Sequence, residues 1–314
     1  MRCVSRITAL SFAAWGALVA LLTPGTSAAF EGPGTAGAAY LTLSLGPKSI
    51  AMGEVKAALP GDPFDWIANP AALGWMDGVG LGAVHAQWIL DTQYEHLSLH
   101  HRVNGVFAAA GSFFFQHRPD ILGSDDIGRP TGQLKSNNYQ AVIGLAFSPI
   151  RSFTAGVNVK YFRERLDSFH AGGVAVDLGV AYSFSPVGIR LGAAAQNLGA
   201  DVKFDDVGEP LPTTLRAGAS HAFALVPRTL ECTYAFDLVK PRFESLFLSA
   251  GAEVRLYETL ALRAGWCGGE SRKGSGFTAG AGAMLLNRVQ LDYAWTPYGE
   301  LGNFHRVSLY FSFD

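Results

Sequence analysis

The chain has 314 residues, of which 49% are hydrophobic and only 16% are charged, against about 25% charged residues in typical soluble domains. The formal net charge is −2 and no long basic run occurs, so the electrostatic footprint of a nucleic-acid-binding protein is absent. This composition argues against a nucleic-acid partner, and the low content of charged residues needs an explanation.

Residues 1–28 are predicted to be a signal peptide. Arg2 and Arg6 precede an apolar run from Ile7 to Leu22, and small residues follow at 26–29, where a signal peptidase would cleave. The alternative is a retained anchor helix. Beyond residue 30 no window contains the roughly 18 to 20 consecutive apolar residues that a membrane-spanning helix needs. We therefore expect an exported protein whose mature chain has no helical span.

Residues 29–78 are predicted to form a small, partly helical N-terminal plug or hatch segment. The stretch from Gly37 to Leu73 lacks the alternation of apolar and polar residues that characterises the rest of the chain. Its position before the first predicted strand would let it fold into the lumen of a barrel. Asn69, Pro70 and Ala71 are predicted to be the hinge between this plug and the first strand.

Residues 79–314 are predicted to form a transmembrane β-barrel. Apolar residues recur at every second position, as at Val174, Val176 and Leu178, with small or charged residues between them. A soluble sandwich or barrel and a membrane barrel both produce this pattern. The second face is rich in Gly, Ala and Ser with single charges among them, which favours the crowded polar lumen of a membrane barrel.

About fourteen strands are predicted in this region, an even number as in bacterial single-chain barrels. Their expected starts are residues 80, 93, 105, 138, 152, 170, 187, 213, 229, 245, 259, 275, 288 and 304. Every second connection is tight and most of the others are longer, which is the pattern of outer-membrane barrels. A barrel of this size leaves an open lumen, which the plug would fill.

Charged residues on the second face are the candidate ligand or lumen residues. A charge that faces lipid at mid-depth costs roughly 2–4 kcal/mol, so these side chains should point inward. They can form ion pairs that hold strands and plug together, or Arg190, Arg216 or Arg263 can meet an anionic headgroup of a ligand. The full candidate set is Arg190, Arg216, Glu253, Arg255, Arg263 and Asp292.

Enzymatic chemistry is not expected. His96 and His100 share one strand face, but no acidic or thiol side chain is spaced with them as a metal ligand. Ser98 and His100 lack an acid that would order them for nucleophilic catalysis. The sequence thus predicts no catalytic residue, no metal and no cofactor.

The sequence resembles the PorV/PorQ family, a branch of the FadL-like outer-membrane barrels. The resemblance extends over nearly the whole mature chain, and its motifs are Gly34-Thr35-Ala36-Gly37, Leu45-Gly46, Ala51-Met52-Gly53, Asn69-Pro70-Ala71, Gln196-Asn197-Leu198-Gly199, Leu211 to Gly218, Leu262-Arg263-Ala264-Gly265 and Leu291-Asp292-Tyr293. It implies a plugged, fourteen-stranded antiparallel barrel in the cell outer membrane of a diderm bacterium.

Two functions follow from this interpretation. The first is passive transport of hydrophobic, fatty-acid-like molecules, which enter from the external loops, bind beside the plug and leave through a local opening. The alternative, implied by the resemblance, is a PorV/PorQ-like component of a type IX secretion system that binds or hands over exported proteins. The expected partners are outer-membrane lipid and lipopolysaccharide, with a hydrophobic small molecule or an exported protein.

Overall fold

The computed structural model describes residues 36–313 except 125, 168, 205–206 and 270–274. The predicted signal peptide, residues 1–28, lies outside the described residues, as do the first residues of the predicted plug. No helix in the described part of the chain is long and apolar enough to cross a membrane.

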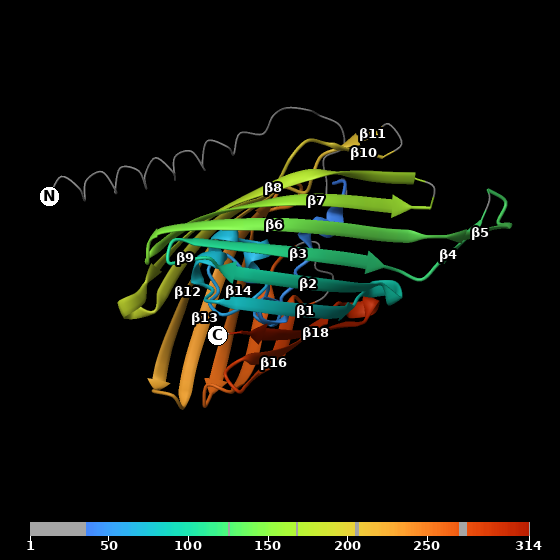
Figure 1. The fold of residues 1–314 in the computed structure, drawn as a ribbon. Helices are drawn as coiled ribbons and strands as arrows, with labels where there is room; N and C mark the ends of the chain where they lie inside the picture. The colour runs from blue at the N-terminus through green and yellow to red at the C-terminus, as the bar shows by residue number, and fades with distance from the viewer. Residues whose placement is uncertain (1–35, 125, 168, 205–206, 270–274, 314) are drawn as a thin grey trace. The chain divides into compact units, whose positions relative to one another are not determined.

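Fourteen antiparallel strands close into a barrel in which β1 pairs with both β2 and β18 (Figure 1). The wall strands are β1 (Val79–Gln87), β2 (Gln93–Arg102), β3 (Phe107–His117), β6 (Ser136–Ile150), β7 (Phe153–Leu166), β8 (Phe169–Phe184), β9 (Ile189–Leu198), β12 (Thr214–Val226), β13 (Leu230–Pro241), β14 (Phe247–Leu256), β15 (Leu260–Cys267), β16 (Phe277–Leu285), β17 (Val289–Pro297) and β18 (Asn303–Ser312). Every neighbouring pair is hydrogen-bonded, although the loop-end part of β8, residues 169–175, extends past its partner β9.

The two ends of the barrel differ in their connections. At one end, here called the turn end, short turns join the strands, as at Tyr257 and Glu258, which both adopt positive φ as tight hairpin turns require. The other end, the loop end, carries two additional hairpins that lie outside the wall. The elements at the loop end are η4 (Ile89–Asp91), β4 (Ile121–Ser124), β5 (Pro130–Leu134), β10 (Val202–Phe204), β11 (Val207–Glu209) and η6 (Gly299–Leu301), and η5 (Ser185–Val187) lies at the turn end.

The predicted strand pattern is confirmed. Each of the fourteen expected starts lies within two residues of an observed one. The cause is the inverted burial of the wall, in which most large apolar side chains face outward, while polar, charged and small side chains and some apolar ones such as Phe114 face the lumen. Leu97 is 56% exposed and Leu262 is 65% exposed, whereas Lys160 and Asp177 are almost completely buried.

The wall strands have unequal lengths. β6, β7 and β8 contain 15, 14 and 16 residues, whereas β15, β16 and β17 contain 8, 9 and 9. Figure 1 shows the long strands extending toward the loop end beside β4 and β5. The barrel wall is therefore taller on one side than on the other.

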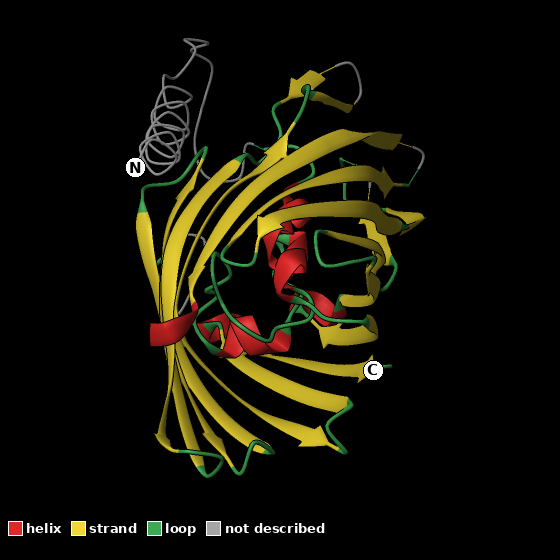
Figure 2. Ribbon diagram, turned by 60° about the vertical axis from the view of Figure 1, so that its left-hand side comes forward, coloured by secondary structure: helices red, strands yellow, loops and turns green. Residues whose placement is uncertain are grey.

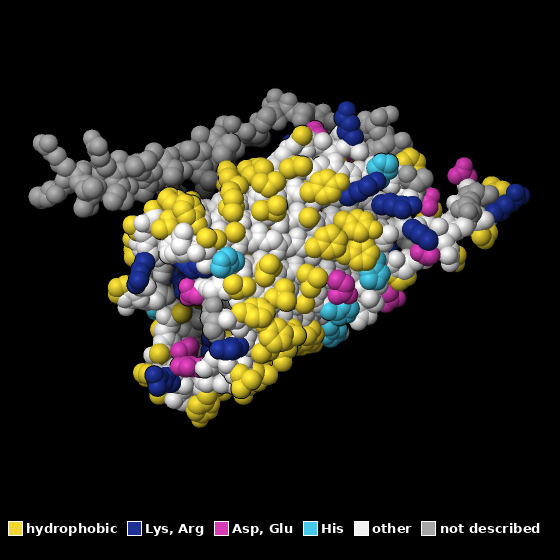
Figure 3. Space-filling view, in the orientation of Figure 1, with side chains coloured by type: hydrophobic (Ala, Val, Ile, Leu, Met, Phe, Trp, Pro, Cys, Tyr) yellow, Lys and Arg dark blue, Asp and Glu magenta, His cyan; other side chains and the backbone are white. Residues whose placement is uncertain are grey.

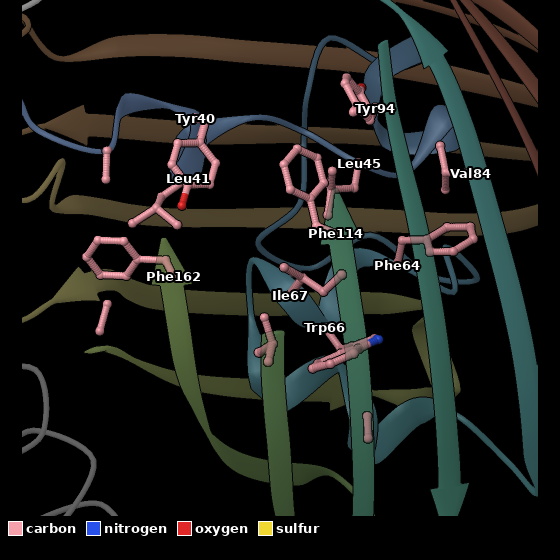
Figure 4. Packing of buried hydrophobic residues seen from close by; sticks show 14 of the residues in the cluster. Tyr40, Leu41, Leu45, Phe64, Trp66, Ile67, Val84, Tyr94, Phe114 and Phe162 are labelled. Atoms are coloured by element: carbon pink, nitrogen blue, oxygen red, sulfur yellow. The ribbon is translucent and has the colours of Figure 1, made fainter. Parts of the chain in front are cut away.

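Residues 36–78, here called the inner segment, lie inside the ring of strands (Figure 2). Their aromatic and aliphatic side chains pack against inward-facing residues of β1, β2, β3, β6 and β7, as the close view in Figure 4 shows for Trp66, Phe64 and Phe114. The hydrophobic core of the protein is thus the lumen of the barrel. The helices of the inner segment are η1 (Ala39–Thr42), α2 (Pro47–Ala51), η2 (Asp65–Ile67) and η3 (Pro70–Trp75).

Candidate functional site

A buried charge network fixes α2 to the wall. The Lys48 ammonium lies 3.3 Å from the Glu253 carboxylate of β14, which also accepts a 2.6 Å hydrogen bond from Arg263 of β15. Arg263 in turn donates to Asp292 of β17 at 2.6 Å, and Arg255 donates to Glu253 at 3.1 Å. Because most of these groups are buried, each charge depends on its partners for compensation. The network joins three wall strands to the inner segment.

Two glycines of the wall allow the inner segment to come this close. A Cβ atom added to Gly251 or Gly265 would overlap the backbone of Met52 and Gly53. The Gly53 amide donates to the Thr278 hydroxyl at 3.0 Å, which donates to the Ala51 carbonyl. The small residues on this face therefore permit backbone contact between wall and inner segment.

Asp237 of β13 holds the chain that follows α2. One of its carboxylate oxygens accepts hydrogen bonds from the backbone amides of Lys56 and Ala57 at 2.7 and 3.0 Å. The same oxygen accepts from Arg216 at 2.8 Å, and Arg216 also donates to the Glu54 carbonyl at 2.9 Å. The Arg216 Nε has no hydrogen-bond partner among the described residues.

The later part of the inner segment is held by amides and apolar contacts instead. Asn69 donates to the Ala57 carbonyl at 2.6 Å, and its side-chain oxygen accepts from the Ala71 amide and so caps η3. Asn158 of β7 donates to the Trp66 carbonyl at 2.9 Å, and the Trp66 indole donates to Ser98 of β2 at 3.0 Å. This part contacts the opposite side of the wall from α2.

A cavity of about 130 Å³, here called the lumen cavity, lies between the inner segment and the wall near the loop end. Its apolar lining comes mainly from Leu41, Leu43, Leu45, Phe64, Ile67, Val239 and Phe247. Its charged lining consists of Glu54, Lys56, Asp65, Lys160, Arg216 and Glu244. The cavity thus offers both an apolar surface and charged groups to one small ligand.

A second cavity of about 140 Å³ lies on the turn-end side of the inner segment. It is lined by Leu59, Gly61, Asp62, Pro63, Ala72, Trp75, Met76, Gln290 and Tyr310. The chain at Gly61–Asp65, here called the partition, lines both cavities: Asp62 and Pro63 face the second one, and Phe64 and Asp65 face the lumen cavity. Asp62 fixes the partition by accepting hydrogen bonds from the Ser49 and Phe64 amides at 2.8 and 2.9 Å.

Two charged groups at the lumen cavity, Lys56 and Asp65, have pKa values that burial shifts from their usual range. Burial, together with the nearby Arg216 guanidinium, lowers the pKa of Lys56 to about 7 against the attraction of Asp65 and Asp237. Burial and the nearby Asp62 carboxyl raise the pKa of Asp65 well above its usual range. The nearby Lys56 ammonium and the Ser49 side chain oppose this rise.

The structure brings together four of the six candidate residues, namely Glu253, Arg255, Arg263 and Asp292. Arg216 lies apart from them at the lumen cavity. Arg190 is separate again, with its guanidinium 4.8 Å from the centre of the Trp75 ring. The expected hinge residues, Asn69, Pro70 and Ala71, are buried at the start of η3, which separates them from β1.

Sequence reasoning missed the charged residues that the inner segment places in the lumen: Lys48, Glu54, Lys56, Asp62 and Asp65. Inward orientation was inferred from alternation along strands, and this segment does not alternate. One signal was available, because isolated charges within an otherwise apolar, strand-free stretch must find partners wherever that stretch is buried.

The strand histidines form aromatic and hydrogen-bonded contacts. His96 lies edge-on to Phe64 at 5.9 Å between ring centres, and a ring nitrogen of His100 lies 2.7 Å from the Tyr310 hydroxyl. Among the residues that the structure describes, no group of three His, Cys, Asp or Glu side chains is placed to hold a metal ion.

Comparison with known proteins gives a match only at the level of structure. No protein-family model matches the sequence, and no curated protein matches it significantly. Among solved structures, the toluene transporter TbuX of Ralstonia pickettii aligns with a TM-score of 0.57 and 16% identity, over 84% of this chain and 96% of its own. The toluene transporter TodX of Pseudomonas putida aligns with a TM-score of 0.58 and 14% identity, over 84% and 96% of the two chains.

A FadL homologue of Pseudomonas aeruginosa aligns with a TM-score of 0.55 and 11% identity, over 86% of this chain and 98% of its own. These alignments cover nearly the whole length of each transporter and more than four fifths of this chain. At such low identity, the likeness concerns the fold. The chain has the fold of the FadL-like fourteen-stranded barrels.

Proposed function

We propose that the protein is a passive conduit for small hydrophobic molecules in the outer membrane of a diderm bacterium. The observation that carries this proposal is the pair of cavities on either side of the partition. An outward-facing apolar surface and a buried polar lumen suit a membrane barrel, and the loop end would face outside, because outer-membrane barrels carry their longer loops there.

The lumen cavity has the size of a single aromatic ring or a short segment of an acyl chain. Its volume of about 130 Å³ is close to the roughly 150 Å³ of an engineered apolar protein cavity that binds benzene. Lys56 and Arg216 at its edge suit an acidic or polar end of a ligand, so a fatty-acid-like amphipath fits the chemistry better than a plain hydrocarbon.

The route crosses the partition rather than the wall. Neighbouring strands of the wall are hydrogen-bonded over most of their length, and a route across the partition needs no opening between strands. A ligand in the lumen cavity needs only a displacement of Gly61–Asp65 to reach the second cavity and then the turn end. We propose that this displacement is the gating step of transport.

The solved structures with this fold support the substrate class. TbuX and TodX are toluene transporters, and a further match, CymD, is a monoaromatic hydrocarbon channel. These proteins differ from this chain in nearly all residues, so they support passage of hydrophobic molecules in general and leave the individual ligand to experiment.

Uptake into liposomes tests the proposal. The protein is reconstituted into phosphatidylcholine vesicles, and entry of a fluorescent fatty acid and of toluene is measured. Leu43→Trp places a large side chain in the lumen cavity from a half-buried position, so it should reduce uptake strongly while the barrel still folds. Leu301→Trp, on an exposed site in η6, is the matched control and should leave uptake unchanged. Equal uptake by both variants would reject the lumen cavity as part of the route.

The PorV/PorQ-like role in type IX secretion rests on the sequence motifs alone. A survey of neighbouring genes for type IX components tests it, and absence of such components from the genome would eliminate it. The structural matches named above favour transport over this alternative.

A further inference from the structure

The outer surface of β7 and β8 changes character at a defined height. On β8 the outward-facing apolar side chains extend from Phe184 to Val174, which are ten residues apart. At about 3.3 Å per residue and a tilt of about 40°, this distance corresponds to roughly 25 Å of height, the thickness of the apolar band of outer-membrane barrels. Tyr161 of β7 pairs with Val174 and so lies at the upper edge of that band.

Basic side chains begin immediately above this edge. Arg163 and Arg165 follow Tyr161 on the outward face of β7 and pair with Gly172 and His170 of β8. On the other side, Arg165 pairs with Asn137 of β6, which pairs with His117 of β3. Across the fourteen wall strands as described, arginine faces outward only at Arg163 and Arg165. We call Arg163, Arg165, His117 and His170 the arginine patch.

The patch is accessible and lies at an energetically suitable depth. Arg163, Arg165 and His170 are exposed, and His117 is half-buried. An outward arginine costs about 2–4 kcal/mol at the bilayer midplane but almost nothing near the interface, where anionic headgroups lie. Figure 3 shows dark blue and cyan side chains gathered toward the loop end of this face, beside a largely yellow surface.

An apolar groove adjoins the patch. It has a volume of about 380 Å³ and is lined by Leu97, Phe113, Phe115 and Tyr139, with Glu95 at its edge. Phe115 stacks on both His117 and Tyr139, and Tyr139 pairs with Arg163, so groove and patch share neighbouring side chains. The acid at the groove is already paired, because Glu95 lies 2.7 Å from His85 of β1.

We propose that the arginine patch and this groove form a binding site for one phosphorylated, multiply acylated lipid of the lipid A type. The guanidinium groups of Arg163 and Arg165 bind a phosphate, for which their planar donors are well suited, and an acyl chain lies in the groove. Phe115 and Tyr139 lie in register with Arg163, whereas Leu97 and Phe113 lie in register with Tyr161, so the groove begins beside the patch and extends one row toward the apolar band. The site lies on the opposite side of the wall from the lumen cavity.

This inference rests on the proposed placement of the barrel in an outer membrane but does not depend on transport. The protein is refolded into dodecyl maltoside, and binding of diphosphorylated lipid A is followed by native mass spectrometry. We expect the Arg163→Gln/Arg165→Gln variant to bind about thirtyfold more weakly, since each interfacial arginine strengthens binding to an anionic lipid about fivefold.

The control variant Arg151→Gln/Lys240→Gln also removes two positive charges, one at the turn end and one on the outer face of β13. It should bind lipid A as the unmodified protein does. A difference in gel migration between heated and unheated samples should show that both variants are folded. Lipid A stripped of its phosphates should bind weakly and equally to all three proteins. Unchanged binding by Arg163→Gln/Arg165→Gln, equal weakening by the control, or full binding of the stripped lipid would overturn the proposal.

The two proposed functions fail separately in these tests. Uptake is measured in phosphatidylcholine vesicles that contain no lipid A, and lipid binding is measured in detergent without a transported molecule. If the protein binds lipid A but transports nothing, the proposal of a lipid site would stand and the proposal of a conduit would be rejected.

Discussion

The inner segment is attached to the barrel by two kinds of contact. Residues 46–58 are held against β12 to β17 by buried charges, with Lys48, Glu253 and Asp237 at the centre. Residues 64–75 are held against β2 to β9 mainly by apolar packing and by amide hydrogen bonds, as between Asn158 and Trp66. Charged contacts need fixed geometry, whereas apolar contacts tolerate small shifts. The first part therefore fixes the position of the segment, and the second part can adjust.

Removing the acid at the centre of the charged part should give the largest effect. Glu253→Ala leaves Lys48 and Arg255 without their carboxylate partner, while Arg263 retains Asp292. Loss of one partner from a buried ion pair costs about 3–5 kcal/mol. We expect the free energy of unfolding, measured by urea titration in lipid vesicles, to fall by that amount.

Glu258→Ala, at an exposed turn, is the control and should change the free energy of unfolding little. Equal effects of Glu253→Ala and Glu258→Ala would show that the network does not anchor the segment.

A smaller effect is expected in the apolar part. Asn69→Ala removes the cap of η3 and leaves the buried Ala57 carbonyl without its donor, for a combined cost of about 2 kcal/mol. If this part moves during transport, the uptake rate should change as well as the stability. Asn303→Ala, at an exposed position of β18, serves as the control. A change in folding yield with unaltered uptake would make Asn69 a structural residue only.

A third prediction concerns pH. The pKa of Lys56 is lowered to about 7, mainly by burial, from 10.5 when unfolded, so between these values the unfolded chain binds more protons than the folded one. This group therefore destabilises the fold fully below pH 7 and progressively less as the pH rises toward 10.5. Lys56→Met removes that dependence. The free energy of unfolding of Lys56→Met, measured by urea titration, should exceed that of the unmodified protein most near pH 6 and much less at pH 10. The same difference at both pH values would contradict a lowered pKa of Lys56.

The wall could be predicted closely from the sequence because lipid imposes one rule on every strand. A strand with lipid on one side and a lumen on the other must alternate, and the strand starts follow from that pattern. The inward orientation of Glu253, Arg263 and Asp292 follows from the same rule.

The partners of the inward charges could not be predicted. Alternation gives the face of a residue but not its neighbours across the lumen, and Lys48 and Glu253 are 205 positions apart in the chain. Arg190 and Arg263 look alike in sequence, yet one lies over Trp75 and the other belongs to the charge network. The partition could not be predicted either, because its position depends on how a segment without periodicity folds inside the barrel.

The unequal strand lengths have a consequence for the surrounding membrane. At about 3.3 Å per residue and a tilt of about 40°, the eight residues of β15 rise only about 20 Å, less than the roughly 25 Å apolar band of such barrels. Lipids beside β15 to β17 must shorten to match, whereas those beside β6 to β8 need not. The bilayer would then be thinner beside β15 to β17 than on the other side of the barrel. Neighbouring proteins would associate preferentially with this thinner side, because association relieves the hydrophobic mismatch.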